Sequence, residues 1–219
     1  MRDLLSKYKF KKIAVESLKN GIRLHFDSIL LYKNHSFPTS LQISIIALEE
    51  ISKAKWVEHY YYSSITNCGF PEKKFEQKWL YYLFIHPKKQ AAFFAQNIFE
   101  YSPRFVEFAH SGQLENQKQK ATYVGLEKIR KDRKVDVNSR ISIPSKVKKA
   151  SAKKLISLLN DELIDMCKSK LLQDSYFGIQ EMDDIINNSL LENLMQWPYK
   201  SGIKSSKWIV NWKLNSDNN

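Results

Sequence analysis

The sequence is poor in the residues that shape turns, since its 219 residues include only six glycines and six prolines. An all-β sandwich needs frequent turns, so this scarcity argues against that class and favours helices. The two cysteines, Cys68 and Cys167, are too few for a framework of disulfides, and neither lies in a Cys/His pattern typical of zinc sites. We therefore expect a reduced cytoplasmic protein without a structural metal or a cofactor.

Long apolar runs are also lacking. Runs such as Ile45–Leu48 and Leu80–Ile85 are far shorter than the ~20 residues that cross a bilayer. The basic N-terminus is not followed by an apolar stretch, so it does not resemble a signal peptide. With 43% apolar and 26% charged residues, the composition predicts a single globular domain over residues 1–219 and no membrane partner.

Apolar residues recur at spacings of three to five along most of the chain and predict an all-α bundle of long antiparallel helices. Leu30 and Phe75 are among the residues expected on apolar faces. Pro87 should kink or end a helix that starts near Glu72. The other expected helices cover residues 9–32, 39–64, 88–99, 103–110, 146–172 and 180–195. The region 123–143 should be an irregular connection with a short extended piece, and 208–214 an extended tail or edge strand.

Positive charge is concentrated in one segment. The formal net charge is +12, and residues 118–154, with thirteen Lys and Arg against three acids, supply +10 of it. Such a segment attracts polyanions. Tyr123 is its only aromatic residue, which disfavours base stacking and fits phosphate contacts or an acidic protein face equally well. The predicted polyanion contacts are Lys128, Arg130, Lys131, Arg133, Lys134, Arg140, Lys146, Lys148 and Lys149.

Two acids and a lysine interrupt the apolar pattern of the second expected helix. Lys53 shares a face with Glu49 at i,i+4 and lies near Glu50 at i,i+3. A surface ion pair is the simple interpretation, worth a few tenths of a kcal/mol. However, the surrounding stretch from Ser44 to Ile51 is otherwise apolar, so at least one acid should lie near the core and need a partner there.

Two more polar sets follow. In the first, His86, Lys89 and Gln90 share one face if the helix continues through Pro87, and they could supply a proton acceptor and a cation for phosphate. The second runs from Lys118 to Tyr123 and Val124. Solvated charge at helix ends is the alternative interpretation of both sets.

Taken in order, the three sets resemble those of AbiV-type abortive-infection proteins, in the HEPN group of helical domains. That family carries "ALEEhgKA", "HKxKQ" and "KxxxLYVD", and the resemblance covers about residues 10–170. This chain has Ser52 in place of the usual Gly, Pro87 in place of Lys and Gly125 in place of Asp. The residues to which the resemblance assigns the family's polar cluster are Glu49, Glu50, Lys53, His86, Lys89, Lys118 and Tyr123.

The resemblance implies phage defence by a protein that arrests the infected cell, with a HEPN-like core that commonly forms a homodimer. Many HEPN relatives are metal-independent ribonucleases with an Arg-x4–6-His motif whose residues meet across a dimer cleft. Here Arg104 and His110 match that spacing, which makes them the predicted catalytic pair. Six residues turn a helix by about 240°, so the two side chains do not share a face, and a helix-end role for His110 is the alternative.

Two classes of function therefore remain open. The protein is either an RNA-directed toxin that uses the basic segment as its RNA track, or a non-enzymatic protein that acts through a protein partner, with a purely structural polar cluster. In both cases a phage-encoded activator is an expected partner. A homodimer is also expected, and the Tyr60-Tyr61-Tyr62 run would offer apolar surface for it.

Overall fold

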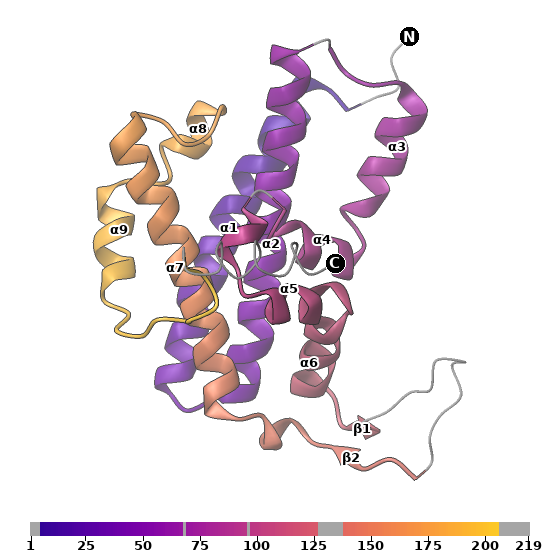
Figure 1. The fold of residues 1–219 in the computed structure, drawn as a ribbon, viewed down its shortest axis with the longest axis vertical. Coiled ribbons are helices and arrows are strands. Elements are labelled where there is room, and N and C mark those ends of the chain that lie inside the picture. Colours follow the sequence, from indigo (N-terminus) through magenta and orange to yellow (C-terminus); the bar gives the residue numbers. More distant parts are fainter. Residues whose placement is uncertain (1–4, 68, 96, 127–137, 206–219) are drawn as a thin grey trace, which may run out of the picture.

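A hairpin of two long antiparallel helices forms the centre of the molecule (Figure 1). The computed structural model describes residues 5–67, 69–95, 97–126 and 138–205. Helix α1 spans Lys7–Lys33, and the Ser6 side chain caps it by accepting a hydrogen bond from the Lys9 amide. Helix α2 spans Phe37–Thr66, with Pro38 in its first turn, where a missing N–H costs nothing. Both helices confirm the sequence prediction.

The two helices approach each other closely at Gly21. A Cβ atom built on this residue would lie only 2.6 Å from Cγ1 of Ile51 on α2. Glycine lowers helix propensity, but here its missing side chain allows the two backbones to pack tightly. The residue that lowers the helix propensity of α1 is therefore the one at which α1 and α2 approach each other closely.

A third long helix, α7 (Lys149–Gln173), packs on both members of the hairpin. Two short helices follow it, α8 (Gln180–Asp183) and α9 (Asn188–Met195). The prediction of one continuous helix over 180–195 is wrong, because Asn187 starts a new helix: its side chain accepts a hydrogen bond from the Leu190 amide, and its backbone is extended.

The middle of the chain supplies several short helices on the other side of α2 (Figure 1). The predicted helix 88–99 is wrong in extent, since α4 ends at Ala92. Beyond it, Phe93 and Phe94 turn into the core against Tyr101. The elements are α3 (Lys73–Tyr82), α4 (His86–Ala92), the 3₁₀ helix η1 (Ile98–Glu100), α5 (Pro103–His110) and α6 (Gln113–Thr122).

The connection before α7 has little regular structure in its described part, as predicted. Strands β1 (Gly125–Leu126) and β2 (Ile141–Ser142) pair antiparallel, with Gly125 opposite Ser142. The 3₁₀ helix η2 (Pro144–Lys146) leads into α7. Apart from this small sheet and an isolated bridge between Tyr101 and Lys204, the regular structure of the described residues is helical, which confirms the all-α class. The predicted tail segment 208–214 lies outside the described residues.

The core consists largely of the apolar residues expected from the helix pattern, with three corrections. Leu30 is 60% exposed and Phe75 57% exposed, so neither faces the core. Of the tyrosine run expected on the surface, Tyr60 and Tyr61 are buried and only Tyr62 is exposed. Tyr60 stacks on Trp79 of α3 with ring centroids 4.0 Å apart, because α3 folds back over that end of α2.

Cys167 is a buried free thiol, and burial raises its pKa to about 11. Cys68 lies outside the described residues. Within the described part of the chain, none of the helices combines the length and the apolar character that a membrane span requires.

A buried ion network fastens the C-terminal part of the described chain to the bundle. The Glu162 carboxylate of α7 is 1% exposed and lies 2.8 Å from Nζ of Lys55 and 2.8 Å from Nζ of Lys204. It also accepts a hydrogen bond of 2.6 Å from the Tyr101 hydroxyl. Lys204 pairs with Asp165 as well, at 2.7 Å. Four distant segments therefore meet at one carboxylate.

The electrostatics of this network fit fixed charges. Burial opposes ionisation of Glu162, but the two lysines outweigh it and lower the pKa of this carboxyl to about 2. Burial would also favour neutral Lys204, yet Glu162 and Asp165 raise the pKa of its ammonium above the usual range. Burial and the neighbouring Glu162 raise the pKa of Tyr101 far above its usual value. We call Glu162, Lys55, Tyr101 and Lys204 the Glu162 network.

Candidate functional site

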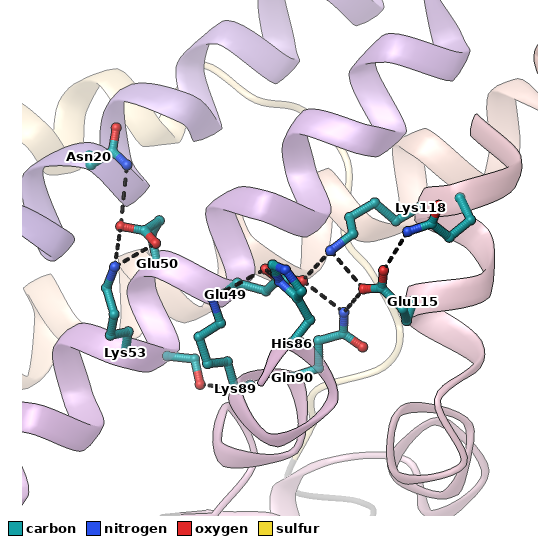
Figure 2. Close-up of polar contacts among 11 residues, drawn as sticks. Asn20, Glu49, Glu50, Lys53, His86, Lys89, Gln90, Glu115 and Lys118 are labelled. Carbon is teal, nitrogen blue, oxygen red and sulfur yellow. Dashed lines mark hydrogen bonds and ion pairs between the residues drawn. The ribbon is translucent and has the colours of Figure 1, made fainter. Parts of the chain in front are cut away.

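A second buried carboxylate, Glu49, lies in the middle of α2 and gathers polar groups from two other helices (Figure 2). Glu49 is 2% exposed. Its Oε2 lies 2.6 Å from Nδ1 of His86 and 3.6 Å from Nζ of Lys89. Its Oε1 accepts hydrogen bonds from Nε2 of Gln90 at 2.8 Å and from Nζ of Lys118 at 2.9 Å. This carboxylate is therefore paired on both oxygens, as burial requires.

Helix α4 begins at His86 and carries three of these partners. Pro87 occupies its first turn, where it favours the helix and leaves His86, Lys89 and Gln90 on one face. The Ser52 hydroxyl of α2 donates a hydrogen bond to the Lys89 carbonyl and so joins the two helices beside Glu49.

Helix α6 supplies the rest of the site. Glu115 and Lys118, one turn apart, form an ion pair of 2.6 Å, and Gln119 donates a hydrogen bond to Glu115 at 2.7 Å. Gln90 also donates to Glu115, at 3.2 Å. Although burial alone would raise the pKa of Glu115, the hydrogen bonds from Lys118 and Gln119 lower it. We call Glu49, His86, Lys89, Gln90, Glu115 and Lys118 the Glu49 cluster.

Most of the cluster is closed to solvent, but one of its members is not. Lys89 is 7% exposed and Lys118 8%, whereas the side chain of His86 is 52% exposed. An ionised carboxylate can accept hydrogen bonds but cannot donate them. Ionised Glu49 therefore holds His86 in the form that carries a proton on Nδ1. The other ring nitrogen, Nε2, is then the one that can accept or donate a proton in chemistry at the surface.

The cluster also contains a possible set of metal ligands. Glu49, His86 and Glu115 each offer one ligand atom, and these atoms lie within 4.8 Å of one another. Lys118, however, contacts both carboxylates and, with Lys89, already balances their charge. A divalent cation would have to displace that ammonium against the repulsion of both lysines, so this donor set fits a metal poorly. The absence of a metal stays a prediction.

Comparison with known proteins places this site in a family. The HEPN_AbiV family model, described as AbiV, matches residues 9–165. The chain belongs to the AbiV family. The matched range runs from α1 through most of α7 and includes the whole Glu49 cluster. No curated protein and no solved structure matches the chain.

The AbiV-like motifs divide between two places in the fold. Glu49, His86, Lys89 and Lys118 meet in the Glu49 cluster. Glu50 and Lys53 do not join them. They pair with each other at 2.7 Å, and Asn20 of α1 donates to Glu50 at 3.2 Å (Figure 2). Neighbouring residues on a helix point about 100° apart, which separates Glu50 from Glu49.

Tyr123 lies away from the Glu49 cluster. It follows the last residue of α6, its backbone is extended, and its side chain is 62% exposed. Gly125, where the resemblance led us to expect an acid, begins β1. As a glycine it offers no side chain to the site. Among the described residues of the third motif, Lys118 belongs to the cluster, and Gln119 donates a hydrogen bond to Glu115 of the cluster.

Two residues of the cluster were absent from the predicted site. Gln90 was recognised on the face of His86 and Lys89, but it was not assigned a role. Glu115 was missed, although its i,i+3 spacing from Lys118 was a usable signal. A tertiary contact gives Glu115 its importance, because α6 must pack on α2 to bring this pair next to Glu49.

The structure does not bring Arg104 and His110 together within one protomer. They lie near opposite ends of α5 and line different pockets. Arg104 borders a pocket of about 460 Å³ with Gln117 and Lys154, whereas His110 borders one of about 720 Å³ with His59. The catalytic pairing of Arg104 with His110 across a dimer stays a prediction.

The predicted polyanion contacts are only partly described. Arg140, Lys146, Lys148 and Lys149 have exposed side chains along the connection into α7, as contacts with phosphate would require. Nζ of Lys149 lies 5.7 Å from the centre of the Tyr32 ring. The others, Lys128, Arg130, Lys131, Arg133 and Lys134, lie outside the described residues.

Proposed function

We propose that this chain is an antiphage protein that arrests the infected cell by acting on RNA or translation after activation by a phage factor. Membership of the AbiV family indicates abortive-infection defence. The single observation that carries the biochemical part is the half-exposed imidazole of His86, whose Nδ1 lies 2.6 Å from the buried Glu49 carboxylate.

The chemistry of this pair suits attack on a phosphodiester. A buried carboxylate that accepts the Nδ1 proton orients the ring and stabilises the imidazolium that forms when Nε2 takes a proton. Lys89 and Lys118 lie on the same carboxylate, and in this proposal their positive charge would stabilise the negative charge that develops on the phosphorane. In this proposal the pair activates the 2′-hydroxyl of an RNA nucleotide, and the lysines bind the phosphate.

The basic connection extends the proposal to RNA binding. Exposed Arg140, Lys146 and Lys148 would contact the RNA backbone, and such contacts weaken steeply as salt rises. The proposed homodimer would place two such connections on one assembly.

A second function is favoured by a different observation. The ammonium groups of Lys89 and Lys118 are buried and ion-paired, as in a cluster that only joins α2, α4 and α6. In that case the protein acts without catalysis, through contact with a protein partner.

The deciding experiment compares phage-infected cells that express the wild type, His86→Asn, Glu49→Gln or Glu50→Gln. Glu50→Gln is the matched control, since it removes the neighbouring charge on the same helix. We expect arrest and RNA cleavage in the wild type and the control, and loss of both in His86→Asn and Glu49→Gln. RNA integrity and protein synthesis are the readouts, with protein level and fold checked for each variant.

The alternatives predict other patterns. If folded His86→Asn still arrests cells and cleaves RNA, the proposed proton acceptor is wrong. If the wild type arrests cells but leaves RNA intact, the protein acts by binding. A parallel His110→Ala variant tests the Arg104–His110 prediction, which requires that RNA cleavage be lost with this histidine.

A further inference from the structure

Helix α3 lies at one edge of the molecule and turns one face to solvent (Figure 1). Its inward face is fixed. Trp79 stacks on Tyr60 of α2 with ring centroids 4.0 Å apart. The buried Glu76 carboxylate accepts hydrogen bonds from the Tyr60 hydroxyl at 3.1 Å and from the Leu5 amide at 3.3 Å. The helix is therefore held in one orientation, and its outward side chains form a fixed set.

Three large aromatic side chains of this region are exposed to solvent. Phe75 and Tyr81 belong to α3, and the exposed fraction of Tyr81 is 63%. Phe84, in the turn that follows the helix, is 79% exposed. Exposed apolar side chains gathered in one region mark an interaction site, because contact with water costs free energy that a partner would recover.

The same face carries positive charge. Lys74, Lys78 and Tyr81 follow at i, i+4 and i+7, so they form one stripe along the helix, and both lysines are exposed. Neither Lys74 nor Lys78 forms an ion pair with a described acidic residue. Glu76, the one acid in α3, is buried on the inward face. The outward face of α3 is therefore basic and aromatic.

This combination favours a membrane surface over a folded protein as the partner. Lysine is depleted in the centre of protein interfaces, where its ammonium would lose water. At the surface of a membrane, lysines keep their ammonium groups among the headgroup phosphates while aromatic rings lie at the boundary of the acyl chains. The positive charge of the stripe complements anionic lipid.

We infer that the outward face of α3 binds the surface of a membrane that contains anionic lipid. Phe75, Tyr81 and Phe84 enter the headgroup region, and Lys74 and Lys78 contact lipid phosphates. The sequence predicted no membrane partner because it lacks a spanning segment, but attachment to a membrane surface needs none. The inference goes beyond the proposed function and does not depend on it.

Binding is tested with the full-length protein and lipid vesicles. One set of vesicles contains equal parts of phosphatidylcholine and phosphatidylglycerol, and the other contains phosphatidylcholine alone. The bound fraction is measured by sedimentation of the vesicles at low and at moderate salt. We expect at least tenfold tighter binding to the anionic vesicles, and weaker binding as salt screens the lysines.

One pair of variants tests the charge of the face. Lys78→Gln should weaken binding to anionic vesicles by about fivefold, the usual contribution of one lysine near an anionic surface. The matched control is Lys168→Gln, which changes an exposed lysine of α7, across the molecule from α3 (Figure 1). The control should leave the affinity unchanged.

A second pair tests insertion of the aromatic rings. Phe84→Ser should weaken binding by about five- to tenfold at both salt concentrations, because it removes apolar contact and no charge. The matched control, Leu172→Ser, removes a side chain that is 85% exposed near the end of α7 and should have no effect. Circular dichroism confirms that each variant is folded.

Four results would overturn the inference. The first is no binding to anionic vesicles, and the second is binding that neither Lys78→Gln nor Phe84→Ser weakens more than its control does. The third is binding of an oligoadenylate RNA, without vesicle binding, that Lys78→Gln abolishes, which would assign the face to nucleic acid. The fourth is an oligomeric state that Phe84→Ser changes, again without vesicle binding, which would assign it to a second copy of the chain. All four leave the test of His86 and Glu49 unaffected, because that test measures arrest and RNA cleavage.

Discussion

Two buried carboxylates on neighbouring helices, Glu49 of α2 and Glu162 of α7, have similar ion pairs but different surroundings. Glu162 meets two lysines and a tyrosine, all of which are largely enclosed, and its low pKa keeps it charged. Glu49 also meets two lysines, but its closest described partner is the half-exposed His86. The members of the first network are all enclosed, whereas the second includes an imidazole that is half exposed to solvent.

The two networks differ in what their buried ion pairs hold in place. The Glu162 network joins α2, α7, the residue after η1 and the C-terminal segment, where Ser102 donates to the Ile203 carbonyl at 2.8 Å. It has the features of a structural brace. The Glu49 cluster uses the same type of ion pair to hold an imidazole at the surface. The comparison can be tested by removing one group at a time.

The largest effect is expected from Glu162→Gln. The change leaves two enclosed ammonium groups without this carboxylate, which should cost about 3–5 kcal/mol of unfolding free energy. Urea unfolding at pH 7 measures it, with Glu16→Gln, in an exposed pair with Lys19, as a control that changes stability by under about 1 kcal/mol. A loss no larger than in the control would show that Glu162 is not a brace.

The same network has a definite pH window. The pKa of Glu162 is about 2 in the folded protein against 4.5 for an ordinary glutamate. Because the folded value is lower, its contribution is complete above pH 4.5 and declines as the pH falls towards 2. The difference in stability between wild type and Glu162→Gln should therefore be constant from pH 7 to 5.

The next-largest effect on stability should come from His25, a buried histidine that belongs to neither carboxylate network. Its contribution to the loss of stability in acid can therefore be separated from theirs. Burial lowers the pKa of His25 to about 4, although a hydrogen bond with Asn160 opposes this shift. The unfolded chain binds a proton near pH 6.5 and the folded chain does not. Stability should therefore fall by about 3 kcal/mol as the pH drops from 6.5 to 4.

His25→Leu should flatten this pH dependence, and urea unfolding at pH 7, 5.5 and 4.5 measures the slope. The exposed His35→Asn variant should keep the wild-type slope. An unchanged slope in His25→Leu would mean that another group causes the loss of stability in acid.

Glu49→Gln should have a smaller effect on stability than Glu162→Gln. Lys118 keeps its ion pair with Glu115 at 2.6 Å, and His86 reaches solvent, so less charge is left unpaired. We expect a loss of about 2 kcal/mol in urea unfolding at pH 7. Glu50→Gln, with its half-buried partner Lys53, should cost less than about 1 kcal/mol. Equal losses in Glu49→Gln and Glu162→Gln would remove the distinction between the two networks.

The smallest effect on stability should come from His86→Asn, because its side chain is half exposed. We expect a change of under about 1 kcal/mol in unfolding free energy, together with loss of the arrest described above. A large destabilisation would instead assign His86 to the packing of α4 on α2.

Much of the fold could be predicted because helix periodicity is local. The spacing of apolar residues was sufficient to place α1, α2 and α7, and a proline lies in the first turn of α2 and of α5. Local patterns did not predict where a helix ends when contacts with residues distant in the sequence determine its end. Phe93 and Phe94 end α4 early by turning towards Tyr101, and Asn187 separates α8 from α9.

The sequence by itself determined the helical class, the family and the need for a partner beside an acid in an apolar stretch of α2. Only the tertiary structure decided which of the two acids is buried and which side chains are its partners. Glu49 and Glu50 are equivalent in a local pattern, but the rotation of about 100° between them directs one towards α4 and α6 and the other towards Asn20. Glu162 shows the same limit, since Lys55 and Lys204 are brought to it by packing across more than forty residues of chain in each direction.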